Sequence, residues 1–379
     1  MSLDNTMRDF QEFVKRSLKQ VEFATHPTEE CENFPSMIHI EPTNSCNLHC
    51  IHCHHHETET KNASYKRPLG IMKMPLYQKI IDEIAPLHCA ITLDVQGEPT
   101  LHPKFLDMVS YAKERGVAVS VITNATRLTE SMSRELLRLK LNRIMMSFDS
   151  VNKEVYEKVR VRAHFIPTLK NILTFIKLNA DAGHPTHVCV SMVDQKASRD
   201  HVDEFKTFFE NLPIDQVFLN PLLNLAGVSG SSEEVELPTQ QKSKPRAEWP
   251  ICRVPFEYLT VNWDGEITAC PVDVNVVYSA GNVAEESLKQ IWNNERMRAF
   301  RRAHLTKDYS CVEKNGPLCG SCNCLWYPGY DLRDYETHAA EAITRTAVQF
   351  APQFVAQSGT KNESEKYQNL LTEIAKLGG

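Results

Sequence analysis

Residues 37–53 read MIHIEPTNSCNLHCIHC, and this stretch decides the fold because it joins a strand to a cysteine-rich loop. Its first part, Met37–Glu41, has the composition of a short β-strand. Its second part places three thiols at spacings of four and three residues, in Cys46, Cys50 and Cys53. Thiols at these spacings can turn toward one centre, so the loop after the first strand is a candidate metal site.

Further short β-branched runs follow and alternate with amphipathic segments, which predicts a parallel α/β sheet with right-handed crossovers. The expected strands are Met37–Glu41, Ala90–Val95, Val117–Ile122, Arg143–Phe148, Val188–Val193 and Gln216–Asn220. The expected helices are Leu76–Ile84, Pro103–Arg115, Thr129–Leu139, Ile166–Ala180 and Arg199–Asn211. Six repeats are two fewer than a closed eightfold barrel has, so we expect a partial (β/α)6 barrel with its chemistry at the carboxyl ends of the strands.

Composition divides the rest of the chain. A Ser-, Gly- and Pro-rich stretch predicts a linker, and Asp264-Gly265 between Phe256–Val261 and Glu266–Ala269 predicts a β-hairpin. A helix is expected over Leu288–Ala303. The expected parts are an N-terminal helical segment (1–35), the barrel (36–223), the linker (224–250), a small α+β iron–sulfur module (251–330) and a helical tail (331–379).

The charge balance excludes several classes of partner. The 379 residues carry 42 basic and 48 acidic side chains, a net charge of −6, which provides no basic footprint for nucleic acid or for a membrane surface. No apolar run approaches the ~18 residues of a membrane span, and the chain starts without a signal-peptide pattern. We therefore expect a cytoplasmic protein. Its 12 cysteines then favour metal or iron–sulfur ligation over disulfides.

The first cysteine loop has two interpretations. Three thiolates would leave one iron of a [4Fe–4S] cluster open, and an open metal position is where chemistry takes place. Alternatively, the loop would hold a structural zinc in a Cys3His site, with a fourth ligand from His49, His52 or His54–His56. The spacing alone does not choose between them.

The spacing Cys46-x3-Cys50-x2-Cys53 after a first strand resembles the signature of the radical S-adenosylmethionine (SAM) superfamily. Three further motifs follow at successive strand ends over residues 36–220. Gly97-Glu98-Pro99 resembles the family's GEP motif, Thr123-Asn124 its TN motif, and Ser147-Phe148-Asp149 its S-x-D motif. Arg160 falls where the family often places a partner for the methionyl carboxylate, although Arg162 is the alternative.

The resemblance implies a cofactor set and its ligands. The three cysteines would hold a [4Fe–4S] cluster whose open iron binds SAM, and one-electron cleavage would yield a 5′-deoxyadenosyl radical. A flavodoxin or ferredoxin-type protein would supply the electron. The residues implied in SAM binding are Gly97, Glu98, Pro99, Asn124, Ser147 and Arg160, with His52 beside adenine where the family usually has an aromatic residue.

A second set of cysteines lies in the C-terminal part of the chain. Cys252 and Cys270 flank the expected hairpin, and Cys319 and Cys322 form a C-x2-C pair. Four thiolates make a closed site, suited equally to a [4Fe–4S] cluster or to structural zinc. Beside the first motif, the region resembles the Twitch or SPASM modules of radical SAM enzymes. No cysteine follows residue 324, so we expect a single auxiliary cluster, the Twitch arrangement.

These features lead to three functional hypotheses. The first is oxidation of a small hydroxylated, sugar- or cyclitol-like substrate with an auxiliary cluster as electron acceptor, as in 2-deoxy-scyllo-inosamine dehydrogenase-like enzymes. The second is peptide modification, although only about 35 residues precede the first strand, too few for a peptide-recognition domain. The third is an epimerase in which Cys189, on the polar side of Val188–Val193, donates a hydrogen atom.

Overall fold

The computed structural model describes residues 23–24, 26–54, 65–87, 89–225, 245, 248–324, 327 and 330–332. The chain forms two compact units, and the barrel strands all belong to the second. Most of the expected N-terminal helical segment, linker and C-terminal tail lies outside the described residues. The first unit is Met1–Thr28, Pro245–Arg253 and Leu325–Gly379, and the second is Glu29–Lys244 and Val254–Cys324.

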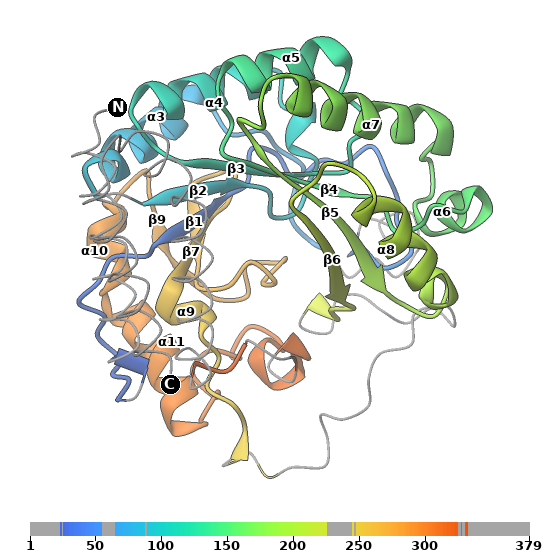
Figure 1. The fold of residues 1–379 in the computed structure, drawn as a ribbon. Helices are drawn as coiled ribbons and strands as arrows, with labels where there is room; N and C mark the ends of the chain where they lie inside the picture. The colour runs from blue at the N-terminus through green and yellow to red at the C-terminus, as the bar shows by residue number, and fades with distance from the viewer. Residues whose placement is uncertain are drawn as a thin grey trace, which may run out of the picture. The chain divides into compact units, whose positions relative to one another are not determined.

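The second unit is built on one nine-stranded sheet in the order β6-β5-β4-β3-β2-β1-β7-β8-β9 (Figure 1). Each pair from β6 to β7 is parallel, and β7, β8 and β9 pair antiparallel. The strands are β1 Met37–Ile40, β2 Ala90–Leu93, β3 Val119–Thr123, β4 Arg143–Ser147, β5 His187–Asp194, β6 Gln216–Pro221, β7 Tyr258–Val261, β8 Glu266–Thr268 and β9 Ser279–Asn282.

Helices α3 to α8 cover one face of the parallel strands (Figure 1). Among the described residues, none of the helices combines the length and the apolar character that crossing a bilayer requires. The helices are α3 Met74–Ile84, α4 Phe105–Glu114, α5 Glu130–Arg138, α6 Lys153–Val159, α7 Phe165–Asp181, α8 Val202–Glu210, α9 Val254–Glu257, α10 Leu288–Trp292 and α11 Glu295–Thr306. Short 3-10 turns span Ala85–Leu87, Pro99–Leu101, Arg199–His201 and Cys319–Ser321.

Local sequence explains where the helices begin and what they bury. In α3, a proline stands in the first turn, and Tyr77, Ile80, Ile81 and Ile84 recur at helical spacing and are fully buried. The Thr129 side chain accepts a hydrogen bond from the Met132 backbone N–H and so caps α5. These apolar stripes cover the sheet and form the core of the second unit.

Alternation along the strands gives the sheet two different faces. In β1, Ile38 and Ile40 have no exposed surface, whereas Met37 and His39 between them are partly exposed. The fully apolar face is the one that helices cover, so His39 points to the opposite face. Functional side chains of the strands are therefore to be sought on this second face and at the carboxyl ends.

The expected α/β partial barrel is confirmed, and two local predictions are wrong. Residues 288–303 form two helices, because the Asn294 side chain accepts the Met297 N–H and caps α11, which competes with a continuous helix. Phe256 is helical, in α9, so the strand begins only at Tyr258. The structure also joins β7 to β1 in parallel, which makes the hairpin an extension of the barrel sheet.

Candidate functional site

The first thiol loop leaves the carboxyl end of β1. Cys50 is buried at 8% exposure, and Cys46 and Cys53 are half-buried. Two backbone hydrogen bonds fasten the loop beside the end of α6, from His49 N to Val161 O and from Ile51 N to Val159 O, each at 3.0 Å. The loop is therefore anchored at its start by β1 and in its cysteine-rich part by these two hydrogen bonds.

The loop's electrostatics suit a bound cationic centre. Burial raises the pKa of Cys50, and the neighbouring Cys53, Asp149 and Cys46 raise it further, while Arg160 opposes them. Burial likewise raises the pKa of Cys46. Thiols that resist ionisation alone become thiolates when a metal centre supplies positive charge, so this donor set fits an iron–sulfur cluster.

No three His, Cys, Asp or Glu side chains among the described residues are grouped as ligands of one metal ion. The ligand roles of Cys46, Cys50 and Cys53 therefore stay predictions.

Glu98 ties the ends of β2 and β3 together. Its Oε1 accepts hydrogen bonds from Thr100 N (3.1 Å), Thr100 Oγ1 (2.6 Å) and Thr123 Oγ1 (2.7 Å), and its Oε2 accepts one from Asn124 N at 2.7 Å. Burial raises the pKa of Glu98, while these donors lower it. Pro99 begins the 3-10 turn that Glu98 caps. The carboxylate is thus largely occupied by the chain itself, and its contact with the SAM ammonium stays a prediction.

The thiol loop and the GEP segment are in direct contact at Gly97. A Cβ placed on Gly97 would lie 2.2 Å from Thr43 O and 2.6 Å from Ser45 O, so only glycine fits there. Glu98 N donates to Ser45 O at 2.9 Å. Asn124 completes the junction, since its Nδ2 lies 3.8 Å from Cys46 Sγ. Motif residues from β2 and β3 therefore converge on the first cysteine.

Asp149 and Arg160 form a buried ion pair beside the thiol loop. Arg160 Nε lies 2.8 Å from Asp149 Oδ2, and their side chains are 6% and 0% exposed. Burial would lower the pKa of Arg160, but Asp149 raises it overall. Arg162, by contrast, lies at the surface, with Nη1 2.6 Å from His49 Nε2. Which of the two binds the methionyl carboxylate stays a prediction.

Ser147 ends β4, and His52 in the thiol loop contacts the residue that follows β5. Ser147 Oγ accepts a hydrogen bond from Ser191 Oγ at 3.3 Å across β4 and β5. His52 Nδ1 lies 3.2 Å from Nε2 of Gln195, the residue that follows β5. Both positions agree with a site along the carboxyl edge of the sheet, and the contacts of these residues with SAM stay predictions.

Cys189 lies on β5, and its thiol has no exposed surface. Arg143 Nε donates to its Sγ at 3.4 Å, and burial raises its pKa. The hydrogen-donor role remains a prediction that mutation can test.

The auxiliary cysteines divide between the two units. Cys252 belongs to the first unit, is buried and forms a β-bridge with Asp331. Cys270 follows β8, and Cys319 and Cys322 bracket a 3-10 turn in the second unit. The set of four thiolates therefore stays a prediction from the sequence.

Two histidines that the sequence analysis did not select have defined partners. His304 on α11 is fully buried, and burial lowers its pKa to about 3, so the ring is neutral. Its Nε2 lies 3.5 Å from Cys319 Sγ. His39 Nδ1 lies 2.9 and 3.0 Å from the two carboxylate oxygens of Asp94, just past β2. The signal for His39 was a polar residue between two isoleucines on a core strand.

The His39–Asp94 pair can take up a proton. The side chains are 19% and 13% exposed, and His39 Nε2 makes no hydrogen bond with the described residues and is not sealed from solvent. Burial lowers the pKa of His39, but the Asp94 carboxylate raises it by a larger total. A histidine oriented by a carboxylate through Nδ1 is the arrangement of a general base.

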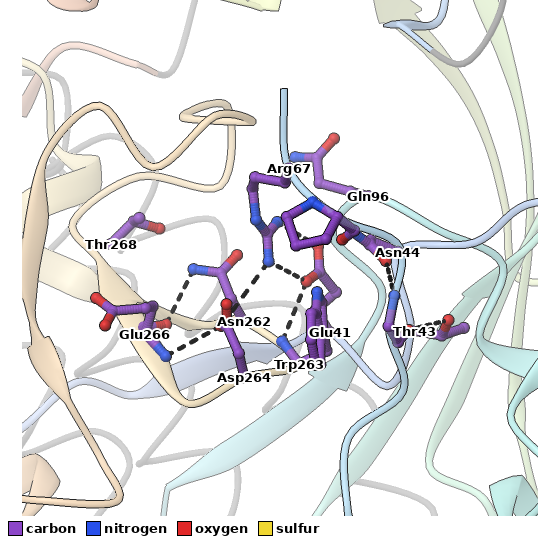
Figure 2. A network of polar contacts seen from close by, with 12 residues as sticks. Glu41, Thr43, Asn44, Arg67, Gln96, Asn262, Trp263, Asp264, Glu266 and Thr268 are labelled. Carbon is purple, nitrogen blue, oxygen red and sulfur yellow. Dashed lines mark hydrogen bonds and ion pairs between the residues drawn. The ribbon is translucent and has the colours of Figure 1, made fainter. Parts of the chain in front are cut away.

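A buried polar network lies where β1 ends and the β7–β8 turn begins (Figure 2). Arg67 donates to both oxygens of Glu41, at 3.0 and 2.8 Å, and Glu41 Oε2 also accepts the Trp263 backbone N–H at 3.1 Å. The ring of Trp263 lies against Gly70, where an added Cβ would come within 2.3 Å of it. The network connects the strand that leads to Cys46 with the hairpin that leads to Cys270.

Comparison with known proteins agrees with this geometry. Residues 40–208 match the Radical SAM superfamily, and residues 252–323 match SPASM, an iron–sulfur cluster-binding domain. A cofactor-modifying protein for the tungsten-containing aldehyde ferredoxin oxidoreductase of Pyrococcus furiosus is 28% identical over 357 residues, which cover 83% of this chain and 96% of that protein.

Two further relatives extend the comparison. The mycofactocin maturase MftC of Mycobacterium tuberculosis is 29% identical over 320 residues, 76% of this chain and 75% of that protein. The crystal structure of BtrN in complex with AdoMet and 2-DOIA shares the fold, with a TM-score of 0.51 and 19% identity over 77% of this chain and 94% of that one. Its cofactors are therefore SAM, the [4Fe–4S] cluster of the radical SAM domain and auxiliary iron–sulfur clusters in the SPASM domain. The chain thus combines a radical SAM domain with a SPASM domain.

Proposed function

We propose that the protein is a radical SAM oxidoreductase that removes hydrogen from an unactivated carbon and oxidises the product radical by one further electron. The observation that carries this proposal is the convergence of the ends of β2 and β3 on the thiol loop, through Gly97, Glu98 and Asn124. We assign the SAM site to the barrel (36–223) and the auxiliary site to residues 251–330. A flavodoxin or ferredoxin-type protein would supply the reducing electron.

The chain's own residues would bind and orient the cofactors. Cys46, Cys50 and Cys53 would ligate the cluster whose open iron holds SAM, and that pair supplies the 5′-deoxyadenosyl radical. Arg160 would bind the methionyl carboxylate, and the clamp formed by Glu98 would keep the ends of β2 and β3 in place around SAM. Cys252, Cys270, Cys319 and Cys322 would ligate the auxiliary cluster.

Oxidation of the substrate radical requires one proton acceptor and one electron acceptor. We assign the proton to Nε2 of His39, because Asp94 orients its ring and the side chain is partly exposed. The electron would pass to the oxidised auxiliary cluster. A C–H bond and an O–H bond are thereby lost and a carbonyl forms, which suits a small hydroxylated, sugar- or cyclitol-like substrate.

A peptide substrate is the second candidate. It is favoured by the similarity to the maturase MftC over three quarters of both chains. The same proton and electron acceptors would serve a peptide carbon, so the two candidates differ in substrate and share the chemistry. Deuterium transfer from labelled candidate substrates into 5′-deoxyadenosine separates them.

The cluster assignment is tested first, without any substrate. After anaerobic reconstitution, two [4Fe–4S] clusters require about eight irons per chain, and dithionite with SAM should yield 5′-deoxyadenosine. Cys50→Ala should abolish that product, while Cys89→Ala, a buried cysteine outside both sets, should retain it. Stoichiometric zinc without labile sulfide, or full SAM cleavage by Cys50→Ala, would refute the proposal.

The oxidative step is tested next, with the labelled substrate that transfers deuterium. Cys322→Ala should leave SAM cleavage and deuterium transfer intact while oxidised product falls. Unchanged product would remove the auxiliary cluster as electron acceptor. Cys189→Ala should have no effect on oxidation, and loss of an epimerised product with deuterium transfer retained would favour the epimerase instead.

A further inference from the structure

His304 and Cys319 make a contact that the proposed ligand set does not include. His304 lies in the last turns of α11, and Cys319 begins the 3-10 turn that carries the C-x2-C pair. Nε2 of the ring is 3.5 Å from the sulfur, a hydrogen-bond distance for sulfur. The two residues are 1% and 8% exposed, so water competes little for either atom.

The second ring nitrogen determines which way this hydrogen bond points. The Tyr309 hydroxyl lies 3.4 Å from His304 Nδ1, and Tyr309 has no exposed surface. A thiolate bound to iron has no hydrogen, so in the loaded protein Nε2 must carry the proton toward Cys319. A neutral ring then has a bare Nδ1, which accepts the hydroxyl hydrogen of Tyr309. The two hydrogen bonds therefore point the same way: Tyr309 donates to His304, and His304 donates to the Cys319 sulfur.

The turn that carries Cys319 is held from its other side. Glu313 Oε1 accepts hydrogen bonds from Leu318 N at 3.3 Å and from Gly320 N at 2.5 Å. A Cβ on Gly320 would lie only 2.8 Å from that oxygen, so the carboxylate and the turn are closely packed. The turn that carries the sulfur is therefore held by contacts that do not involve His304.

We propose that His304 is a positioning residue for the auxiliary cluster, which donates its Nε2–H to the Cys319 sulfur and thereby favours the reduced cluster. The inference rests on the proposed ligand role of Cys319. A hydrogen bond to a cluster sulfur stabilises the more negative, reduced state and raises the reduction potential. His304 would in this way make the auxiliary cluster a better acceptor for the electron of the substrate radical.

The experiment measures the reduction potential of the auxiliary cluster alone. Cys46, Cys50 and Cys53 are replaced by alanine in the full chain, so that one class of cluster remains, and its reduction is followed by EPR in an anaerobic redox titration. In this background, His304→Leu should lower the equilibrium constant for reduction of the cluster at least tenfold. For a one-electron couple this lowers the reduction potential by about 59 mV. His304→Gln, whose amide N–H can replace Nε2–H, should recover most of the shift.

Two matched variants separate hydrogen bonding from packing. Tyr309→Phe removes the hydroxyl that orients the ring without touching the sulfur, and should shift the potential in the same direction by a smaller amount. Glu313→Gln keeps an acceptor for the turn and removes a negative charge beside it, so in this variant the potential should not fall. A potential within error of the parent in His304→Leu would overturn the inference.

Iron content distinguishes this inference from the ligand assignment on which it rests. Cys319→Ala should remove the remaining irons and their signal, and an intact cluster in that variant would overturn the ligand role itself. If Cys319→Ala loses the cluster while His304→Leu keeps both cluster and potential, the ligand role stands and the inference about His304 fails. If His304→Leu does not fold, Tyr309→Phe decides: a potential within error of the parent in that variant overturns the inference.

Discussion

The buried pair of Glu41 and Arg67 should couple the first barrel strand to the C-terminal hairpin. Both side chains are almost fully buried, at 0% and 6% exposure, and two charge-assisted hydrogen bonds join them. Burial raises the pKa of Glu41, and Arg67 opposes that rise. Arg67→Met fills similar space but leaves the carboxylate unpaired, which for a buried ion costs about 3–5 kcal/mol in the free energy of unfolding.

A double-mutant cycle isolates the pair. Glu41→Gln alone leaves the guanidinium with only the more distant Asp264 as a charge partner, whereas Glu41→Gln with Arg67→Met removes both charges of the pair together. We therefore expect the double variant to lose less stability than the sum of the single losses, by about 2 kcal/mol or more. Urea denaturation of the reduced, metal-free chain, followed by far-UV circular dichroism, measures each corner of the cycle.

An exposed pair provides the control. Glu130 and Arg134 are salt-bridged on the surface of α5, with side chains 61% and 62% exposed. Arg134→Met should leave the urea midpoint unchanged, because exposed pairs contribute little. Additive losses at Glu41 and Arg67, or a loss at Arg134 as large as at Arg67, would refute the reasoning about burial.

Three more outcomes follow from single contacts. Gly97→Ala should lower the free energy of unfolding by about 1–3 kcal/mol and abolish SAM cleavage, because the new Cβ clashes with the backbone oxygen of Thr43. Retained cleavage in the 5′-deoxyadenosine assay would contradict this. Arg301→Leu should lower the free energy of unfolding by about 3 kcal/mol or more, because the buried guanidinium donates hydrogen bonds to three backbone carbonyls. A urea midpoint equal to the parent's would refute that role. The raised pKa of His39 means that its pairing with Asp94 stabilises the fold below pH 6.5 and loses that effect as pH rises through the folded pKa, so Asp94→Asn should cost more stability at pH 6 than at pH 9. An equal cost at the two values would show that the pair does not titrate.

The barrel strands could be predicted to within about two residues because each carries its own signal. A β-branched run such as Val188–Val193 has few alternatives once amphipathic helices flank it. The pairing of β7 with β1 carries no such signal, since it joins Met37 to Tyr258 across the length of the chain. Parallel partners are chosen by packing of the whole sheet, which short-range patterns do not contain.

The candidate site divides in the same way. Cys46, Cys50 and Cys53 could be singled out from the sequence because their spacing is itself the signal, and their ligand roles stay predictions. His304 was not, because its only local feature is a histidine on a helix, and its meaning depends on a sulfur that a separate turn brings to 3.5 Å. Contacts made by tertiary packing are thus the part of a site that spacing cannot provide.

The position of β1 gives the two predicted metal regions a common support. On one side β1 pairs with β2, whose end carries Gly97 and Glu98, and on the other it pairs with β7, whose turn leads to Cys270. A displacement of β1 therefore changes the SAM region and the hairpin together, and the two cannot adjust independently. This explains why a costly buried ion pair stands where β1 ends, at Glu41. If β1 is this support, Arg67→Met should change the EPR signals of both clusters, whereas His304→Leu should change only the auxiliary one.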